Sequence, residues 1–383
     1  MRATKEFLAS KADRQFGLSL VELLVALAVV GLLSTAIFSF FLHTSQGVSQ
    51  QSANGEMWQR GRNAMAIMRQ AIESAGYGLP SYSQCPNGVV GNTSTGSPAA
   101  LVAITASPQS SGSSYDPSSS SGISTYAFST VIGGGSFGGA PATTVTGNRG
   151  GGHSENIPVA STQALQVCDY VLLTPSGGSG ACLAGQITNL PSNAVGLNSG
   201  KSCGTSLSLN PNQIFLTPLP GSNGSTTTIG AGASLYNLGF QNFLFQQFQI
   251  METPAGSTPT LYMTQYTGAQ AAAPAPQALA SGVVDIQMLY GLGTNGSVQS
   301  WVAPEKYTPS ATQSIVAVQL AMLIRSTRYL PNSLSPASFD ILGQTYTVPT
   351  SGGPGCLQGN CRHYEYHLFQ SIIPVRNGIW GEQ

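Results

Sequence analysis

The side chains that could hold a metal or perform covalent chemistry are few in this chain. Six cysteines occur in 383 residues, and no two of them have the C-x-x-C spacing of a zinc site. An even number of cysteines in an exported segment indicates disulfides. The spacing leads us to predict three pairs, which are Cys356–Cys361, Cys182–Cys203 and Cys85–Cys168.

The three predicted pairs differ in the loops that they would close. Gly359 and Asn360 lie between the first two cysteines, and both residues suit a tight turn. The second pair would close a loop rich in Gly, Ser and Asn, and the third would tie the end of a helix to a sheet. Six cysteines allow fifteen pairings, so other connectivities stay open.

Histidines and carboxylates form no catalytic constellation that we can identify in the sequence. His363 and His367 are four residues apart, a spacing that can ligate a metal on a helix. Tyr364 and Tyr366 alternate with them, however, and this alternation is typical of a strand. The aspartates are isolated, and no calcium-loop pattern occurs. We therefore predict no enzymatic activity, no metal and no cofactor, and a structural role in the sheet for Asp285.

The charge content narrows the class of protein. Charged residues are 7% of the chain and the formal net charge is zero, whereas ordinary soluble domains have about 25% charged residues. A protein that neutralises phosphates needs a basic surface, so we predict no nucleic-acid partner. The composition favours an exported protein, rich in loops and strands, over an intracellular enzyme.

Residues 18–42 form an apolar run of 25 residues with a single charge, Glu22. As a helix the run would be about 37 Å long, which is enough to cross the hydrocarbon core of a membrane. The 17 residues before it carry a net positive charge. Positive flanking residues stay in the cytoplasm, so we expect the rest of the chain on the other side of the membrane.

Glu22 is unusual because a carboxylate in lipid is costly and needs a partner. One interpretation is that it reaches the membrane interface, since it lies near the helix end. The other is that it awaits a positive group supplied by assembly. A secretory signal peptide cut near residues 34–36 and a plain signal anchor are further alternatives.

Residues 17–23 read GLSLVEL and resemble the class III signal of type IV pilins and type II secretion pseudopilins. In that family a prepilin peptidase cuts after the glycine, and the new amine is N-methylated. The resemblance therefore implies cleavage between Gly17 and Leu18 and methylation of Leu18. It also implies that Glu22 is an assembly carboxylate, which pairs with the N-terminal amine of a neighbouring subunit. Phe or Met is commoner than Leu after the cut, and this departure fits a minor subunit.

The periodicity of the apolar residues predicts the secondary-structure elements that position these side chains. Trp58, Met65, Met68 and Ile72 share one helical face, and glycines at 76 and 78 indicate a helix end. We predict one continuous helix over 18–75, with two helices hinged near 44–55 as the alternative. Its parts are a leader at 1–17, a transmembrane helix at 18–42 and an amphipathic continuation at 43–76.

The rest of the chain is predicted to be a β-rich head. Residues 77–160 are dominated by Gly, Ser, Thr, Pro and Asn, and we expect a long loop region there with one strand at 124–132. Residues 161–383 carry recurrent strand patterns. The predicted strands are 165–174, 213–217, 240–250, 261–267, 283–290, 314–326, 344–348 and 364–375. The fold class is α+β and pilin-like, with the helix packed on an antiparallel sheet.

Several head motifs are similar to those of PilW-type minor pilins. They are VVDIQMLYG at 283–291, Trp301, LIRS at 323–326 and the ending that begins RHY at 362–364. The resemblance implies a minor pilin that helps to initiate a type IV pilus. Its partners would be other minor and major pilins, prepilin peptidase and the inner-membrane assembly platform. We expect a single-pass inner-membrane protein with a periplasmic head that enters the surface pilus. The alternatives are a type II secretion pseudopilin and a membrane-anchored adhesin or binding module.

Overall fold

The structure, a computed structural model, describes most of the chain from Leu20 onward. The described residues are 20–80, 85, 89–91, 102–109, 115–134, 142–147, 156–175, 182–197, 229–240, 243–254, 257–267, 274–294, 296–309, 313–331, 333–350, 356 and 359–375. The chain divides into two compact units, Met1–Ala53 and Asn54–Gln383, and each is described by itself below.

The long helix α1 spans Leu20–Ser74 without a break, so the continuous helix is confirmed and the alternative of two separate helices is wrong. Its first part, Leu20–Phe41, is strongly apolar. The helix ends where the sequence predicts. Gly76 adopts a positive φ of 78°, a conformation that glycine tolerates best, and its amide donates to the carbonyl oxygen of Val131 at 2.7 Å.

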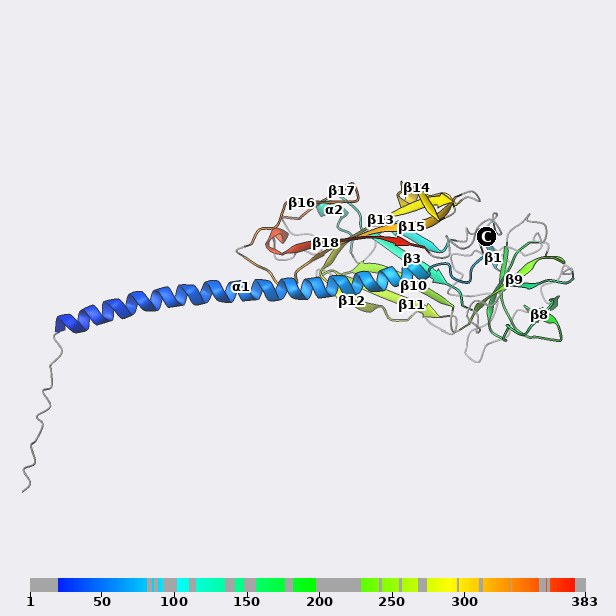
Figure 1. Cartoon of the computed structure of the whole chain (residues 1–383), viewed down its shortest axis with the longest axis horizontal. Coiled ribbons are helices and arrows are strands. Elements are labelled where there is room, and N and C mark those ends of the chain that lie inside the picture. The colour runs from blue at the N-terminus through cyan, green and yellow to red at the C-terminus, as the bar shows by residue number, and fades with distance from the viewer. Residues whose placement is uncertain are drawn as a thin grey trace, which may run out of the picture. The chain divides into compact units, whose positions relative to one another are not determined.

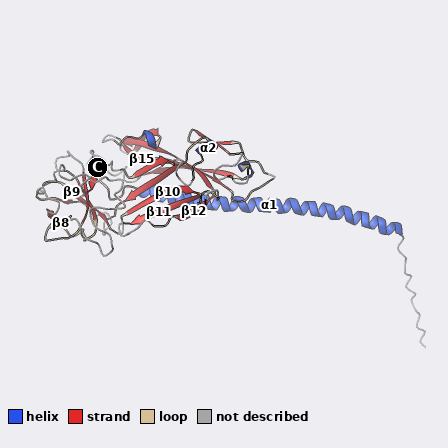
Figure 2. Cartoon of the chain, turned by 180° about the vertical axis from the view of Figure 1, so that it is seen from behind, coloured by secondary structure: helices blue, strands red, loops and turns tan. Residues whose placement is uncertain are grey.

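The second unit contains three main sheets, of which sheets B and C pack against the C-terminal part of α1 (Figures 1 and 2). Sheet A has the order β1 (Val89–Gly91), β7 (Cys182–Gln186), β6 (Tyr170–Leu173), β9 (Ser234–Gly239) and β4 (Thr143–Thr144). Sheet B has the order β12 (Gln277–Ser281), β11 (Thr260–Thr267), β10 (Leu244–Met251), β3 (Tyr126–Ile132) and β2 (Ile104–Pro108). Sheet C has the order β14 (Ser297–Val302), β13 (Val283–Thr294), β15 (Ser314–Arg325) and β18 (Tyr366–Pro374).

Smaller elements complete the described part of this unit. They are the hairpin of β16 (Ser338–Ile341) and β17 (Gln344–Thr347), the pair β5 (Asn156–Pro158) and β8 (Ala194–Gly196), the short helix α2 (Ser118–Ser121), and the 3₁₀ turns η4 (Pro304–Lys306) and η5 (Cys361–His363). Among the described strands, β1 and β7 pair in parallel, and the other pairs are antiparallel. The α+β architecture with an antiparallel head is therefore confirmed.

The main core lies between α1 and the facing sides of sheets B and C. Met57, Ala64, Met68 and Ile72 of α1 are each at most 3% exposed. With Gly61, they recur every three or four residues and so form one helical face. The small residues on this face let the helix approach the sheets closely.

The predicted helical face is partly wrong. Met68 and Ile72 are buried as expected, but Trp58 is 39% exposed and Met65 is only partly buried. The prediction followed the large apolar side chains. In the structure, glycine and alanine occupy the positions where the helix is nearest to the sheets. The prediction missed them because small residues contribute little to a hydrophobic pattern.

Sheet C is covered on both faces, which explains why β15 reads as a nearly unbroken apolar run. The side chains at alternate positions from Val318 to Ile324 contribute to the core with α1. Ala321 and Leu323 point the other way, into a second cluster with Ile341, Tyr346 and other residues around β16 and β17. Arg325 ends the strand and is only 4% exposed.

The region expected to be a long loop contributes more structure than predicted. The single strand expected at 124–132 corresponds to β3, but β1, β2, β4 and β5 also lie within residues 77–160. Each is short and most are paired to strands distant in sequence, so local patterns do not reveal them. Seven of the strands predicted after residue 160 are present with shifted ends, as β6, β10, β11, β13, β15, β17 and β18, and the one predicted at 213–217 lies outside the described residues.

A substitution at Gly61 should show how tightly α1 packs. A methyl group added there would overlap the ring of Phe369 on β18, and that ring contacts the rings of Trp58 and His367. Gly61→Ala should therefore lower the free energy of unfolding by about 1–3 kcal/mol, although alanine is the better helix former.

The matched control is Gly55→Ala, because a methyl group at Gly55 meets no atom within 4 Å. This variant should be neutral or more stable by up to about 1 kcal/mol. Urea denaturation of both variants in detergent solution measures the difference. Equal effects of the two substitutions would contradict close packing at Gly61.

Asp285 on β13 makes the stability of the head depend on pH. It is completely buried, and Gln287 donates to both of its carboxylate oxygens, at 3.0 and 3.1 Å. Burial raises the pKa of Asp285 to about 7, and hydrogen bonds from Gln287 and Thr125 offset the effect only in part. The unfolded chain has the ordinary aspartate pKa near 3.8. The folded state therefore holds a proton that the unfolded state releases, and stability falls as pH rises from about 4 to about 7.

Asp285→Asn should remove this dependence, since asparagine stays neutral. Relative to the wild-type protein, the variant should gain stability between pH 4 and pH 7, on the order of a few kcal/mol. Asp340→Asn, which neutralises an exposed carboxylate on β16, is the control and should show no such trend. A difference between Asp285→Asn and wild type that is constant with pH would contradict a protonated Asp285.

Candidate functional site

The first part of α1 is apolar and uncovered. Leu20–Phe41 has a mean hydropathy of 2.5 over 22 residues, and none of it is buried within the chain. Leu20, Leu32 and Phe40, for example, are 72–75% exposed. Apolar surface of this extent is not stable in water. It requires a covering of lipid or of other apolar helices, and the segment is long enough to span a membrane.

Glu22 lies in the first turn of α1, where a carboxylate also interacts favourably with the helix dipole. Ala26 and Val30 follow on the same face at intervals of four residues. Glu22 is the single charged side chain in the described part of the span. Among the described residues, the salt bridge found joins Arg69 and Glu73, so Glu22 forms no ion pair with another described residue. Gly17 and Leu18 lie outside the described residues.

Two hydroxyl groups within the span are satisfied by the helix itself. Thr35 donates to the carbonyl oxygen of Leu32 at 2.8 Å, and Ser39 donates to that of Ala36 at 2.9 Å. Such bonds let hydroxyl side chains enter an apolar environment. Among the described residues, no comparable hydrogen bond joins the carboxylate of Glu22 to the helix.

The C-terminal part of α1 is fastened to two sheets by polar and aromatic contacts. Arg60 donates to the hydroxyl of Ser281 on β12 at 2.6 Å. On the sheet C side, the ring of Trp58 lies 3.7 Å from that of His367 and 5.3 Å from that of Phe369, measured between centroids. Partial burial lowers the pKa of His367, which favours the neutral ring in this contact. The C-terminal part of α1 is therefore packed as an integral part of the head.

The structure corrects part of the predicted disulfide pattern. Cys85 is joined to Cys182, with Cα atoms 5.4 Å apart, so the predicted pairs Cys85–Cys168 and Cys182–Cys203 are wrong. The parallel pairing of β1 with β7 explains the difference, because it aligns Val89 with Cys182 and brings the chain after α1 next to that strand. Cys168 is also disulfide-bonded, and Cys203 lies outside the described residues.

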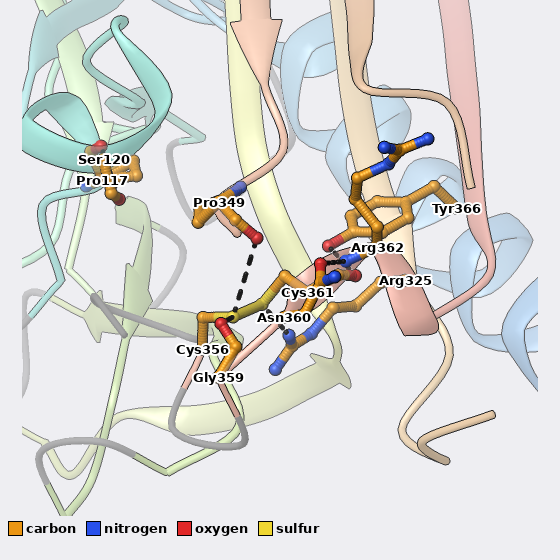
Figure 3. The surroundings of a disulfide bond; sticks show 10 residues. All are labelled: Pro117, Ser120, Arg325, Pro349, Cys356, Gly359, Asn360, Cys361, Arg362 and Tyr366. Atoms are coloured by element: carbon orange, nitrogen blue, oxygen red, sulfur yellow. Dashed lines mark hydrogen bonds between the residues drawn. A yellow bond between two sulfur atoms is a disulfide. The ribbon is translucent and has the colours of Figure 1, made fainter. Parts of the chain in front are cut away.

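The structure joins Cys356 to Cys361, as the spacing predicts, with Cα atoms 5.6 Å apart. Both residues are at most 2% exposed. Figure 3 shows that Arg325, from the end of β15, and Tyr366, from β18, reach this bridge. Sequence reasoning missed Arg325 because it counted the residue as one position of a strand alternation. A cation at the end of a buried strand was the available signal.

The two C-terminal histidines do not converge on a common site. His363 in η5 lies 2.9 Å from the carbonyl oxygen of Ser333 through Nδ1, whereas His367 packs against Trp58. Across the described ranges of the chain, no group of three or more His, Cys, Asp or Glu side chains could hold a metal ion.

Two protein families match parts of the chain. Residues 13–38 match the prokaryotic N-terminal methylation motif, and residues 247–377 match the family described as type IV pilus-assembly protein W, PilW. A comparison with curated proteins and with solved structures found no match. The methylation motif on a long apolar N-terminal helix, together with an antiparallel head, resembles the architecture of type IV pilins.

Residues 247–377, which run from within β10 to just beyond β18, are similar to PilW. The resemblance seen in the sequence is therefore confirmed. PilW proteins are structural proteins of pilus assembly. The matched segment 247–377 contains sheet C and the Cys356–Cys361 bridge, and the Gly- and Ser-rich region at 77–160 lies outside both matches.

Non-reducing peptide mapping of the exported protein tests the corrected pairing. We expect linked peptides that join Cys85 to Cys182 and Cys356 to Cys361, because β1 and β7 place the first pair side by side. A control digest after reduction should release all of these peptides as free thiols. A peptide that links Cys182 to Cys203 in the folded protein would contradict the pairing of β1 with β7.

Proposed function

We propose that this protein is a minor pilin that helps to initiate assembly of a type IV pilus, after cleavage by prepilin peptidase and N-methylation. The observation that carries the proposal is the exposed apolar helix with one carboxylate in its first turn. The PilW match supports the pilus as the destination of the subunit.

The chemistry of assembly follows from Glu22. An unpaired charge at the centre of a membrane helix is disfavoured by roughly 2.5–3.5 kcal/mol on insertion scales, and by less near a helix end. The methylated amine of Leu18 in an adjacent subunit would supply the missing positive charge. In a bundle of apolar helices the low dielectric strengthens this attraction. A helix docked in the wrong register would leave both charges buried and unpaired, so the pair selects one register.

The proposal also fixes a location for each part. The positively charged leader stays in the cytoplasm, the span lies in the inner membrane, and the head lies in the periplasm until the subunit enters the pilus. The partners are other minor and major pilins, the peptidase and the inner-membrane assembly platform. The low charge of the head fits contacts between subunits through apolar and uncharged polar surfaces.

Processing is the first test. The mature protein extracted from membranes should begin at Leu18 and carry a methylated amine, because the cut frees the amine that Glu22 of a neighbour must meet. Intact-mass analysis measures both changes at once. A mature chain that begins at Met1 or near Ala36 would contradict the assignment.

Glu22→Ala tests the carboxylate itself. The span remains apolar enough to insert, so the variant should accumulate as processed protein in the membrane. It should support several-fold fewer surface pili, because the defect lies in docking between helices and not in folding. Pili are counted by electron microscopy and by shearing assays.

Glu56→Ala is the matched control, since it removes an exposed carboxylate from the same helix outside the apolar span. Piliation should be normal in this variant. A Glu22→Ala strain with normal piliation would show that Glu22 only reaches the membrane interface, as expected for a membrane-anchored adhesin that needs no assembly charge.

A further inference from the structure

Arg325 is a buried cation at the Cys356–Cys361 bridge. It ends β15 and is 4% exposed. Its guanidinium carbon lies 4.1 Å from the centroid of the Tyr364 ring. Its Nη1 donates to the Sγ atom of Cys361 at 3.1 Å (Figure 3). A buried positive charge is thus aimed at one particular sulfur atom of the disulfide.

The described part of the chain places no carboxylate partner beside this charge. Among the described residues, no carboxylate oxygen lies within 4.0 Å of the Arg325 nitrogens, since the ion pair found there joins Arg69 and Glu73. The buried Nε of Arg325 also has no hydrogen-bond partner. Burial raises the pKa of Tyr366 to about 12, so this nearby phenol stays neutral at ordinary pH. Removing an arginine from water without a counter-charge costs several kcal/mol.

Reduction of the disulfide would create the missing anion at this place. A disulfide sulfur is neutral, whereas a thiolate beside an arginine forms a charge-assisted pair. A cation next to a cysteine favours the thiolate form. Arg325 therefore stabilises the reduced state of the bridge relative to the oxidised state.

We propose that Cys356–Cys361 is a reversible thiol-exchange site that reacts with a dithiol, and that Arg325 holds Cys361 as the leaving thiolate. The thiolate of the dithiol attacks Sγ of Cys356. The bond between the two Sγ atoms breaks, and its electron pair passes to Cys361. The second thiol group of the dithiol then attacks the mixed disulfide and releases Cys356 as a thiol. Two electrons pass from the dithiol to the protein, and the dithiol leaves as a disulfide.

The surrounding contacts suit a bridge that opens without unfolding the head. The amide of Cys361 donates to the carbonyl oxygen of Pro349 at 2.9 Å, and the hydroxyl of Tyr366 donates to the carbonyl oxygen of Cys361 at 3.1 Å. Neither bond depends on the disulfide. Cys361 thus stays fixed beside Arg325 after reduction, and the Sγ atom of Cys356 lies 3.4 Å from the carbonyl oxygen of Gly359, to which a thiol can donate.

Equilibrium with a redox buffer tests the proposal. The full-length protein in detergent is equilibrated with mixtures of reduced and oxidised dithiothreitol, quenched with acid and alkylated. Peptide mass spectrometry then gives the fraction reduced at Cys356–Cys361 and, as an internal reference, at Cys85–Cys182. We expect the first bridge to be reduced at a dithiol ratio at least tenfold lower than the second, which corresponds to about 30 mV.

Two variants separate charge from packing. Arg325→Gln should make reduction of Cys356–Cys361 at least tenfold less favourable, whereas Arg325→Lys, which keeps the charge, should stay within about threefold of wild type. The equilibrium of Cys85–Cys182 should not change in either variant. Equal behaviour of Arg325→Gln and wild type, or an equal loss in both variants, would overturn the proposal.

A measurement on the wild-type protein covers the case in which Arg325→Gln does not fold. After reduction, the rate of Cys361 alkylation by iodoacetamide is followed against pH. The charged and titratable groups around Cys361 are Arg325, Arg362, Tyr364 and Tyr366. The rate should be half-maximal well below pH 8.5, the ordinary value for a thiol. A midpoint at or above 8.5 would show that Arg325 does not stabilise the thiolate.

Discussion

The rest of the account depends on an apolar helix that the protein does not bury by itself. Leu20–Phe41 is exposed along its whole length, so its favourable environment must come from lipid or from other helices. Both environments are apolar, and transfer of the helix from one to the other changes its hydrophobic free energy little. Charge and shape then decide whether the helix prefers lipid or other helices. The charge in question is that of Glu22, for which the hydrocarbon of the lipid offers no counter-ion.

The head depends on a different property of the same helix. In the C-terminal part of α1, small residues and methionines replace the large apolar residues of the span, and the helix packs between sheets B and C. Gly61 lies against the ring of Phe369, and Arg60 is bonded to Ser281. Because α1 is one helix from Leu20 to Ser74, the apolar span and the residues of α1 that pack in the head belong to one element.

The sequence predicts the features whose chemistry is local. The motif around Glu22 is contiguous, so seven residues are enough to propose cleavage, methylation and an assembly carboxylate, and the methylation-motif match at residues 13–38 supports the proposal. Long apolar strands such as β13 and β15 were also predictable, since their patterns extend over many positions. Three strands of sheet C, β13, β15 and β18, were predicted for this reason, and β14 was not.

Features that depend on distant pairing could not be predicted. The Cys85–Cys182 bridge follows from a parallel pairing between β1 and β7, two short strands about ninety residues apart. Gly61 gives no signal in a hydrophobic pattern, although its lack of a side chain sets the approach of the helix. In the sequence, Arg325 is one polar position of a predicted strand. It is buried because β16, β17 and η5 cover that face of sheet C, and these elements are distant in sequence.

Photo-crosslinking from the apolar span tests the central claim most directly. A photoreactive amino acid at Leu32, which is 72% exposed, would be activated in cells that are assembling pili. Leu334 in the head, 62% exposed, serves as the control position. We predict that Leu32 captures the N-terminal helix of another pilin, and that Glu22→Ala abolishes this product. Adducts with lipid alone, or a protein product that is unchanged by Glu22→Ala, would contradict the account.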